Sequence, residues 1–455
     1  MTKLINPANG KLIGEVAFDS LETVEAKLCT AAAAFQKWRD WKVSERSGKL
    51  KGAAQLLRQR RGNLATIAAR EMGKPLSAGE VEVSKCAVAL EHYAQSAEEM
   101  LKQIPLATSG GKGYLRFEPL GVILGIMPWN YPYWQVIRFA AASLAAGNVV
   151  VLKHAPMVPG CAAALESVFT DAGFTKGVFQ SIRVEDSQAQ KLCAHPLVAA
   201  VTLTGSDRAG AAVAATAGGA IKKTVMELGG SDPFVVLADA DVEFAAASAA
   251  EARCVNSGQS CIAAKRFIVD ASVLEKFTEA FAAAMKKQKV GDPMDPATLV
   301  GPLARKDLLD NLQRQVESSV KAGARVLIGG APLSIEGFYY PPTILTDVRP
   351  GMAVFDEETF GPVAAVVSAK NTAEAIELAN QTLYGLGASL WTRDLAGAEK
   401  LAGEIDCGSV FINAVVRSDP RMPFGGIKRS GWGRELAEAG LKEFMNVKTV
   451  WVNKA

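Results

Sequence analysis

Two cysteines seven positions apart stand in the stretch EARCVNSGQSCIAAKRF, residues 251–267, which contains no histidine. Cys261 follows a Gly-Gln-Ser sequence typical of a loop in which a sulfur can be exposed, whereas Cys254 lies in a helical pattern that predicts burial. A cysteine attacks as its thiolate and needs a neighbouring base or a local positive potential. Because the whole chain has only 3 histidines, we expect a carboxylate to be the base that assists Cys261.

Two further residues could assist the attack of this thiol on a carbonyl group. Glu227 ends a short expected strand, ahead of two glycines that would let a ligand or another loop approach the backbone closely. Asn130 lies in the aromatic loop MPWNYPYWQ, where its amide could stabilise an oxyanion together with the backbone N–H of Cys261. A surface carboxylate and a turn asparagine are the ordinary alternatives. Taken together, the three residues favour a thiol that attacks a carbonyl while Glu227 acts as general base, directly or through water.

Loops at strand ends also suggest a dinucleotide site. In VAAVTLTGSDRAGAAVAATAGG, residues 198–219, a strand runs into Gly205 and Ser206 and then into a small-residue helix, whose N-terminus could bind a pyrophosphate. The spacing is neither GxGxxG nor that of a phosphate loop, so on this loop alone an ordinary strand-to-helix turn is the favoured interpretation. Lys153 ends another expected strand, where it could contact a ribose or phosphate or could be a solvated strand-end lysine.

Composition places these loops in a large globular protein. The 455 residues are 49% hydrophobic and 21% charged, enough for a large core in two or three domains. The net charge of +3 is spread along the chain, which excludes a nucleic-acid or membrane-surface stripe and favours a small-molecule substrate. Apolar stretches end well short of ~18 residues and no leader pattern is present, so a cytoplasmic location is expected. The 7 scattered cysteines argue against a disulfide framework and a structural zinc site.

The spacing of apolar residues predicts the elements that position the loops. Residues 20–38, 50–71 and 78–101 repeat at three and four and predict helices. From about residue 119, short β-branched runs alternate with alanine-rich helical segments, which predicts parallel sheets covered by helices in two α/β domains. The expected strands are residues 121–127, 148–153, 177–182, 198–205, 232–237, 266–270, 324–330, 363–369, 387–392 and 408–413. Residues 107–113 are expected to turn between two extended segments.

The order of these motifs resembles the NAD(P)-dependent aldehyde dehydrogenase family over essentially the whole chain. The matching stretches are NPANG, PLGVILGIMPWNYP, LAAGNVVVLKHAP, VTLTGSDRAG, MELGGSDPFVV, NSGQSCIA, EETFGPV, YGLGASLWT, GSVFIN and PFGGIKRSGWGRE. The resemblance implies the α/β fold of that family: a Rossmann-like dinucleotide-binding domain at residues 1–103 and 120–229, a second α/β catalytic domain at 230–428, and a small β oligomerisation element at 104–119 and 429–455. It also implies a homodimer or homotetramer, because such strands pair across a subunit interface.

Position by position, the resemblance implies Cys261 as nucleophile, Glu227 as general base for thioester hydrolysis and Asn130 in the oxyanion hole. It implies Lys153 at the adenosine ribose of NAD or NADP, the 205–206 turn at the pyrophosphate, and residues 358 and 360 around the nicotinamide. The full expected cofactor set is Pro128, Trp129, Lys153, Pro156, Gly205, Ser206, Leu228, Glu358 and Phe360. No metal is expected. Pro156 stands where NAD-preferring relatives usually have a glutamate, so the choice between NAD and NADP stays open.

Arg138, eight residues after Asn130, resembles an arginine of the succinate-semialdehyde dehydrogenases. A guanidinium can hold a carboxylate bidentately while the aldehyde reaches the sulfur. Ser418 stands in a loop that resembles the substrate-side loop of those enzymes. The predicted activity is oxidation of succinate semialdehyde to succinate, through a cysteine thiohemiacetal and thioester.

Several alternatives remain at this point. Arg138 could be a structural arginine paired with an acid. Val255 replaces a second arginine found in some relatives, which leaves glutarate semialdehyde, another ω-oxo acid or general aldehydes as substrates. An enzyme that passes the acyl group to coenzyme A is a closer alternative, although the presence of Glu227 favours hydrolysis. A thiol hydrolase or an acyltransferase is more remote, because neither would need Lys153, the Gly205 turn or Glu358.

Overall fold

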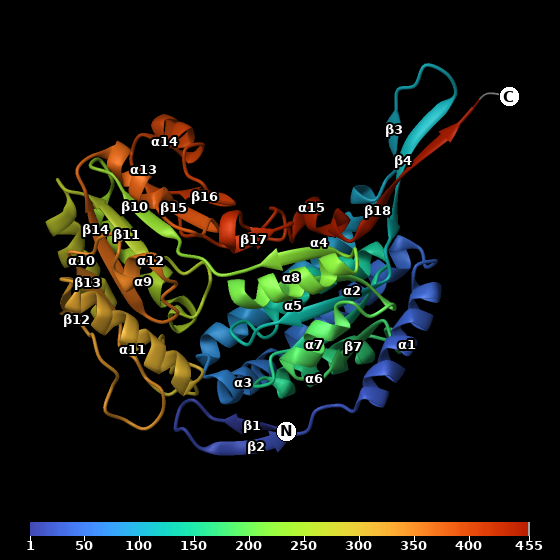
Figure 1. Cartoon of the computed structure of the whole chain (residues 1–455), viewed down its shortest axis with the longest axis horizontal. Coiled ribbons are helices and arrows are strands. Elements are labelled where there is room, and N and C mark those ends of the chain that lie inside the picture. Colours follow the sequence, from blue (N-terminus) through green and yellow to red (C-terminus); the bar gives the residue numbers. More distant parts are fainter. Residues whose placement is uncertain (454–455) are drawn as a thin grey trace.

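The computed structural model describes residues 1–453 and places most of them in two α/β halves and one projecting sheet (Figure 1). The N-terminal half contains a six-stranded sheet of order β17-β9-β8-β5-β6-β7, and the C-terminal half a seven-stranded sheet of order β12-β13-β14-β11-β10-β15-β16. Neighbouring strands are parallel except in the pairs β17–β9 and β12–β13. The predicted α/β fold with parallel sheets is confirmed.

Five strands of the six-stranded sheet, β5 to β9, form from the short runs that the sequence marks as strands. Its strands are β5 (Val122–Met127), β6 (Val149–His154), β7 (Phe179–Ile182), β8 (Val198–Thr204), β9 (Lys223–Glu227) and β17 (Gly431–Trp432). Helices α5 (Trp134–Ala146), α6 (Pro159–Asp171), α7 (Asp186–Leu192), α8 (Asp207–Gly219) and α15 (Ala437–Glu443) belong to the same half. Every residue of β6 is buried, because helices cover both faces of a parallel sheet.

Four helices precede this sheet and pack into the same core. They are α1 (Leu21–Trp38), α2 (Val43–Gln59), α3 (Arg61–Met72) and α4 (Leu76–Met100). Ser20 caps α1 by accepting a hydrogen bond from the Thr23 N–H at 3.1 Å. The single helix predicted for residues 50–71 is divided at Arg60 into α2 and α3, although the helical character of the segment is confirmed.

The C-terminal half buries both faces of its sheet. Its strands are β10 (Pro233–Val236), β11 (Arg266–Asp270), β12 (Arg325–Ile328), β13 (Thr343–Thr346), β14 (Val363–Ala369), β15 (Gly387–Trp391) and β16 (Ser409–Ile412). Its helices are α9 (Val242–Cys254), α10 (Leu274–Lys286), α11 (Lys306–Lys321), α12 (Ala353–Asp356), α13 (Thr372–Asn380) and α14 (Leu395–Ala402), with 3-10 turns η1 (Val255–Gly258) and η2 (Lys428–Ser430). Phe234 and Val236 face one buried cluster and Val235 the other, as the twofold alternation of a strand requires.

Three smaller features complete the chain. The antiparallel strands β3 (Ile104–Leu106), β4 (Lys112–Pro119) and β18 (Met445–Val452) form a sheet that projects from the body (Figure 1). The hairpin of β1 (Thr2–Ile5) and β2 (Leu12–Val16) was not predicted, nor was β13. Within the segment 429–455 that we expected to form oligomerisation strands, β17 pairs with β9 of the six-stranded sheet, and residues 454–455 lie outside the described residues. Over residues 1–453, no helix has the length and apolar character needed to span a membrane.

The topology of the six-stranded sheet creates a crevice at the carboxyl ends of its strands. The chain runs outward from β5 through β6 to β7 on one side and through β8 to β9 on the other, so the strand order reverses between β5 and β8. In open α/β sheets, ligands bind at such a switch point. Asn130 follows β5, Gly205 and Ser206 follow β8, and Glu227 ends β9, so the fold collects these predicted site residues at one edge.

A buried ion pair holds the loop that follows β5. Glu82 of α4 pairs with Lys74 at 2.6 Å between Oε2 and Nζ, and both side chains are 1% exposed. The second carboxylate oxygen of Glu82 accepts hydrogen bonds from the backbone N–H groups of Tyr133 and Trp134, each at 2.8 Å. Because these residues begin α5, one carboxylate fixes the aromatic loop in which Asn130 lies.

Candidate active site

One cavity brings together the predicted nucleophile and most of the predicted cofactor residues. It lies at the crevice between the two halves and is lined by Pro128, Trp129, Asn130, Gln135, Thr204, Gly205, Ser206, Leu228, Gly229, Cys261, Arg305, Leu308, Asn311, Glu358 and Phe360. We call it the cofactor-side cavity. Gln135, Arg305 and Asn311 were not predicted, since nothing in their local sequence distinguishes them from surface polar residues.

The chain reaches Cys261 through a strained turn. Asn256, Ser257 and Gly258 have φ angles of 53°, 58° and 73°, so three successive residues adopt the left-handed conformation. A side chain at Gly258 would place its Cβ 2.3 Å from the Gly361 carbonyl. Such strain persists only where surrounding contacts enforce it, and it is typical of functional sites. Asn256 supplies one of these contacts by donating through Nδ2 to the backbone oxygen of Asn130 at 2.8 Å.

Asn130 presents its amide to the Cys261 loop. Its Nδ2 donates to the backbone oxygen of Gln259 at 3.0 Å, and the residue is buried. An amide donor held beside the nucleophile is in place to donate to an oxygen bound at Cys261. The predicted oxyanion role of Asn130 is therefore geometrically feasible and stays a prediction.

The two cysteines of the opening stretch differ in environment as predicted. Cys254 is 3% exposed at the end of α9, with its sulfur 3.6 Å from Met285 Sδ. Cys261 is partly exposed and lines the cavity. Burial raises the pKa of the Cys261 thiol to about 12, while the charges of Arg138 and then Lys265 act to lower it. These two cations supply the positive potential that a thiolate needs where no histidine is available.

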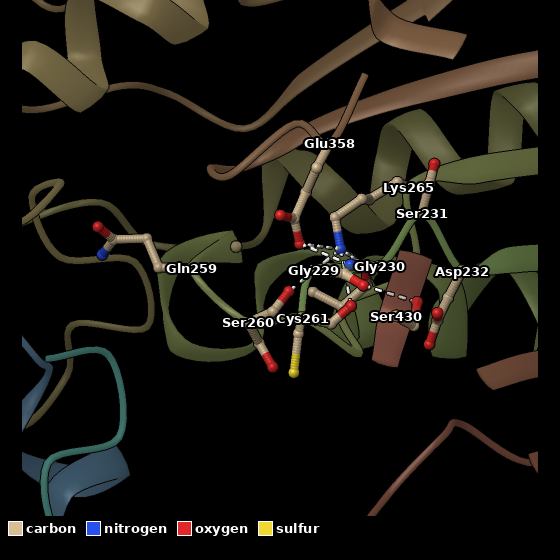
Figure 2. A network of polar contacts seen from close by, with 12 residues as sticks. Gly229, Gly230, Ser231, Asp232, Gln259, Ser260, Cys261, Lys265, Glu358 and Ser430 are labelled. Atoms are coloured by element: carbon tan, nitrogen blue, oxygen red, sulfur yellow. Dashed lines mark hydrogen bonds and ion pairs between the residues drawn. The ribbon is translucent and has the colours of Figure 1, made fainter. Parts of the chain in front are cut away.

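Lys265 was missed by the sequence analysis. It is fully buried, and its ammonium donates to the backbone oxygens of Ser260, Cys261 and Ala263 at 3.2, 2.9 and 3.1 Å. The same nitrogen lies 3.8 Å from Oε1 of Glu358. Figure 2 shows Lys265 between Glu358 and the backbone of the nucleophile loop, with the sulfur of Cys261 directed away from this network. The signal that could have revealed it is a charged residue just before the apolar strand RFIVD.

The two glycines after β9 let the Glu358 loop approach, as predicted. The Gly230 N–H donates to Oε1 of Glu358 at 3.0 Å, and a Cβ on Gly229 would lie 2.5 Å from Oε2 of the same carboxylate. Burial raises the pKa of Glu358, and the charge of Lys265 opposes that shift. Glu358 is thus held at the cofactor-side cavity by a backbone donor and a buried cation.

Glu227 lies in a buried group of charges. It is 2% exposed at the end of β9, and its Oε2 is 3.7 Å from Nη2 of Arg138. Arg138 also pairs through Nε with Glu435 and donates through Nη2 to Thr204 at 3.3 Å. Burial raises the pKa of Glu227 well above its usual range, while Arg138 opposes and Glu435 reinforces the shift. A carboxylate with a raised pKa is suited to take and release a proton near neutral pH.

Arg138 is therefore engaged by structural acids, as the alternative interpretation from sequence foresaw. It is 2% exposed and does not line the cofactor-side cavity. Within residues 1–453, however, its Nη1 has no hydrogen-bond partner, since Glu435 and Thr204 engage the other two nitrogens. The predicted role of Arg138 as a carboxylate ligand stays a prediction.

Lys153 and Pro156 lie apart from the nucleophile. Lys153 is 3% exposed on β6 and pairs with Asp186 at the start of α7. Pro156 lines a separate small cavity together with His154 and Ile182. Their predicted contacts with the adenosine ribose of a dinucleotide stay predictions.

A second cavity borders the same two loops through the residues next in the chain. Its lining includes Lys85, Tyr131, Trp134, Val255, Asn256, Ile262 and Arg417. Tyr131 follows Asn130, and Ile262 follows Cys261, so the two loops separate this cavity from the cofactor-side one. We call it the substrate-side cavity. Lys85 and Trp134 were not predicted as site residues.

Ser418 is buried and contacts two residues that line the substrate-side cavity. Its Oγ accepts hydrogen bonds from Nζ of Lys85 at 2.7 Å and from Nε1 of Trp134 at 3.1 Å. Lys85 comes from α4, 333 positions earlier in the sequence, so only the folded chain brings these residues together. The predicted role of Ser418 in substrate binding stays a prediction.

Comparisons with known proteins agree with this arrangement. A family model described as the aldehyde dehydrogenase family matches residues 1–450. A "Probable succinate-semialdehyde dehydrogenase (NADP(+))" of Synechocystis sp. is 49% identical over 98% of the chain and 99% of its own length. A succinate semialdehyde dehydrogenase (NAD(P)+) of Escherichia coli is 46% identical over 99% of the chain and 97% of its own length. A solved succinic semialdehyde dehydrogenase of Streptococcus pyogenes, in complex with NADP+, is 35% identical with a TM-score of 0.97, covering 99% of the chain and 100% of the neighbour.

The environment of Cys261 predicts how its thiol reacts with iodoacetamide. Arg138→Gln removes the largest attraction for the thiolate, so alkylation of Cys261 at pH 8 should slow by about two- to tenfold, since one pKa unit changes the thiolate fraction about tenfold. Arg138→Lys, which keeps the charge, should stay close to the unmodified protein. The measurement is peptide mass spectrometry over time, with the exposed Cys29 as internal control. Faster alkylation at Cys254 than at Cys261, or no effect of Arg138→Gln, would contradict the assignment.

Proposed function

Because the chain belongs to the aldehyde dehydrogenase family, we propose that it oxidises succinate semialdehyde to succinate, with NADP or NAD as hydride acceptor. The observation that carries the substrate assignment is the cationic Lys85 in the lining of the substrate-side cavity, whose ammonium is hydrogen-bonded to the Ser418 hydroxyl. A cavity with that chemistry suits an aldehyde that bears a distal carboxylate. The names printed for the similar proteins of Synechocystis sp. and Escherichia coli agree with this substrate.

The cofactor-side cavity has the groups that a nicotinamide dinucleotide requires. Gly205 and Ser206 stand at the N-terminus of α8, where backbone N–H groups and the helix dipole favour a pyrophosphate. The carboxylate of Glu358 can accept hydrogen bonds from ribose hydroxyls, and Leu228 and Phe360 give apolar surface for a ring. Lys153 is paired with Asp186. To contact the adenosine end of the dinucleotide, Lys153 would have to leave that partner.

NADP is the better supported of the two dinucleotides. Pro156 removes the acid that would repel a 2′-phosphate, and the similar proteins compared above carry NADP(+) or NAD(P)+ in their printed names.

The residues of the site divide the oxidation into two steps. The sulfur of Cys261 adds to the aldehyde carbon, and the oxygen of the thiohemiacetal accepts hydrogen bonds from the Asn130 amide and the Cys261 backbone N–H. When bound, the nicotinamide supplies the acceptor for the hydride that leaves this carbon. Glu227 then takes a proton from the water that cleaves the resulting thioester, and burial, which raises the pKa of Glu227, makes its carboxylate a stronger base for that step.

Arg138 enters the proposal through its free nitrogen. We retain the prediction that its guanidinium holds the substrate carboxylate, because Nη1 is unpartnered within residues 1–453 while Nε remains paired with Glu435. A glutarate semialdehyde or a general aldehyde is the competing substrate, since no residue of the cavity fixes the chain length alone. A thiol hydrolase or acyltransferase is disfavoured by the family membership and by the cofactor-side cavity.

The substrate assignment predicts a strong preference for the charged aldehyde. Succinate semialdehyde should be used better than butanal by roughly ten- to a hundredfold in kcat/KM, because a buried charge-assisted contact contributes about 1.5 to 3 kcal/mol. Arg138→Ala should remove most of that preference, because succinate semialdehyde loses a partner for its charge in addition to the smaller effect on the Cys261 thiolate that both aldehydes share. The measurement is the initial rate of nicotinamide reduction with each aldehyde.

Two outcomes would revise this assignment. Equal use of both aldehydes by the unmodified protein would remove the semialdehyde acid as substrate. Equal losses for both aldehydes in Arg138→Ala would assign Arg138 to the support of Glu227 and Glu435 instead.

We also propose a cytoplasmic homodimer, or a homotetramer built from two dimers. The projecting sheet exposes apolar side chains on its strands, with Ile104 at 42%, Val447 at 53% and Trp451 at 55% exposed. β18 is an edge strand with one side unpaired within residues 1–453, and such edges are usually covered. All 7 cysteines are free thiols, which supports a reducing compartment.

Light scattering tests the assembly. At micromolar concentration the protein should have at least twice the chain mass of 48.0 kDa, and removal of residues 445–455 should lower the mass to that of the single chain. A monomeric full-length protein, or a truncated protein that keeps its assembly, would contradict the role of β18.

A further inference from the structure

We propose that Lys85 is a specificity-determining residue, whose ammonium, together with the Ser418 hydroxyl, receives the distal carboxylate of an ω-oxo acid. This inference rests on the proposed function. It adds Lys85, a residue that lies outside the motifs from which that function was predicted. In this proposal the cation that selects for an anionic substrate, Lys85, comes from α4, whereas Arg138 comes from α5.

The hydrogen bonds of Ser418 leave donors for an anion. Its Oγ accepts from Nζ of Lys85 at 2.7 Å and from Nε1 of Trp134 at 3.1 Å. Because a hydroxyl that already accepts two hydrogen bonds still has its own hydrogen to donate, the Ser418 O–H is available to a third group. An ammonium has three hydrogens, and only one of those on Lys85 is used by Ser418. The pair therefore offers donors only, which is the complement of a carboxylate.

The charge of Lys85 has no close counter-ion in the described part of the chain. No carboxylate of residues 1–453 lies within 4.0 Å of its Nζ, although other lysines of the molecule form such pairs. Of the acids in the cavity wall, Glu82 is committed to Lys74 at 2.6 Å, and Glu251 is solvent-exposed. Asp419, next to Ser418, is held by Arg421 through two hydrogen bonds of 2.8 and 2.7 Å.

The surroundings make this unpaired charge sensitive to an anion. Nζ of Lys85 lies 4.2 Å from the centroid of the Trp134 ring, which shields it from water on one side. Burial, and after it the nearby charge of Arg138, lower the pKa of Lys85 to about 8. Two cations that repel each other across a partly buried space are both stabilised when a carboxylate binds between them.

The other walls of the cavity suit the body of such a substrate. Tyr131, Val255 and Ile262 carry no charge, and Ile262 directly follows the nucleophile. An aldehyde carbon that reaches Cys261 would thus leave a short apolar chain along these side chains and its acid group at Lys85. Butanal has the same chain and would make no use of the ammonium.

The test is Lys85→Met, which keeps the length of the side chain and removes its charge. We expect kcat/KM for succinate semialdehyde to fall by about ten- to a hundredfold, chiefly through a higher KM, because a charge-assisted contact to the bound substrate is lost. Butanal should change by less than about twofold. Lys85→Arg should recover part of the loss. Lys51→Met, an exposed lysine of α2, is the matched control and should change neither rate.

A binding measurement separates recognition from chemistry. Succinate, the non-reactive dicarboxylate, should bind the Cys261→Ala protein more weakly by a similar factor when Lys85→Met is added, as measured by isothermal titration calorimetry. Unchanged succinate binding, or an equal loss with both aldehydes, would overturn the proposal and leave Lys85 as a positioning residue for Trp134.

The outcomes distinguish this proposal from the proposed function. If the unmodified protein prefers succinate semialdehyde and Lys85→Met keeps that preference, the function stands and the role of Lys85 is overturned. If the unmodified protein has no preference, the substrate assignment and the role of Lys85 are both overturned.

Discussion

The buried ammonium of Lys265 is the interaction on which the geometry of the site depends. It gathers the backbone oxygens of Ser260, Cys261 and Ala263 around one charge and pairs that charge with Glu358. Since Lys265 immediately precedes β11, the position of the nucleophile is fixed relative to the seven-stranded sheet, while the left-handed turn before it packs against the Asn130 loop of the other half. The sulfur of Cys261 thus stands at the junction of the two cores.

A second group of buried charges sets the acid–base properties of the same junction. Arg138 lies between Glu227 and Glu435, so one cation serves two carboxylates that burial alone would protonate. The same guanidinium lowers the pKa of the Cys261 thiol against the larger effect of burial. Nucleophile and base are therefore coupled through one arginine, and a substrate carboxylate that engages its free nitrogen would alter both.

The fold was largely predictable, whereas the residues that support the candidate site were not. β-branched runs identify most strands. The motif order predicts roles for Cys261, Glu227 and Asn130, which lie in glycine-bearing loops at strand ends, and those roles stay predictions. β13 was missed because it is only 4 residues long and follows two prolines. Lys265 and Lys85 were not predicted because their roles depend on contacts that form only in the folded chain. From sequence alone, a lysine beside an apolar run or on a helix is taken for an exposed surface residue. The buried role of Lys265 shows only in the backbone oxygens that it contacts, and the contact of Lys85 with Ser418 shows only in the folded chain.

The most direct test of the account is chemical trapping on Cys261. Glu227→Gln keeps the shape of the side chain and removes the base, so thioester hydrolysis should become limiting after the first oxidation. When this variant is mixed with succinate semialdehyde and NADP, a burst of about one reduced nicotinamide per site should precede slow turnover, and peptide mass spectrometry should find the acyl group on Cys261. Unchanged steady turnover, or an acyl group on any other residue, would contradict the assignment of nucleophile and base.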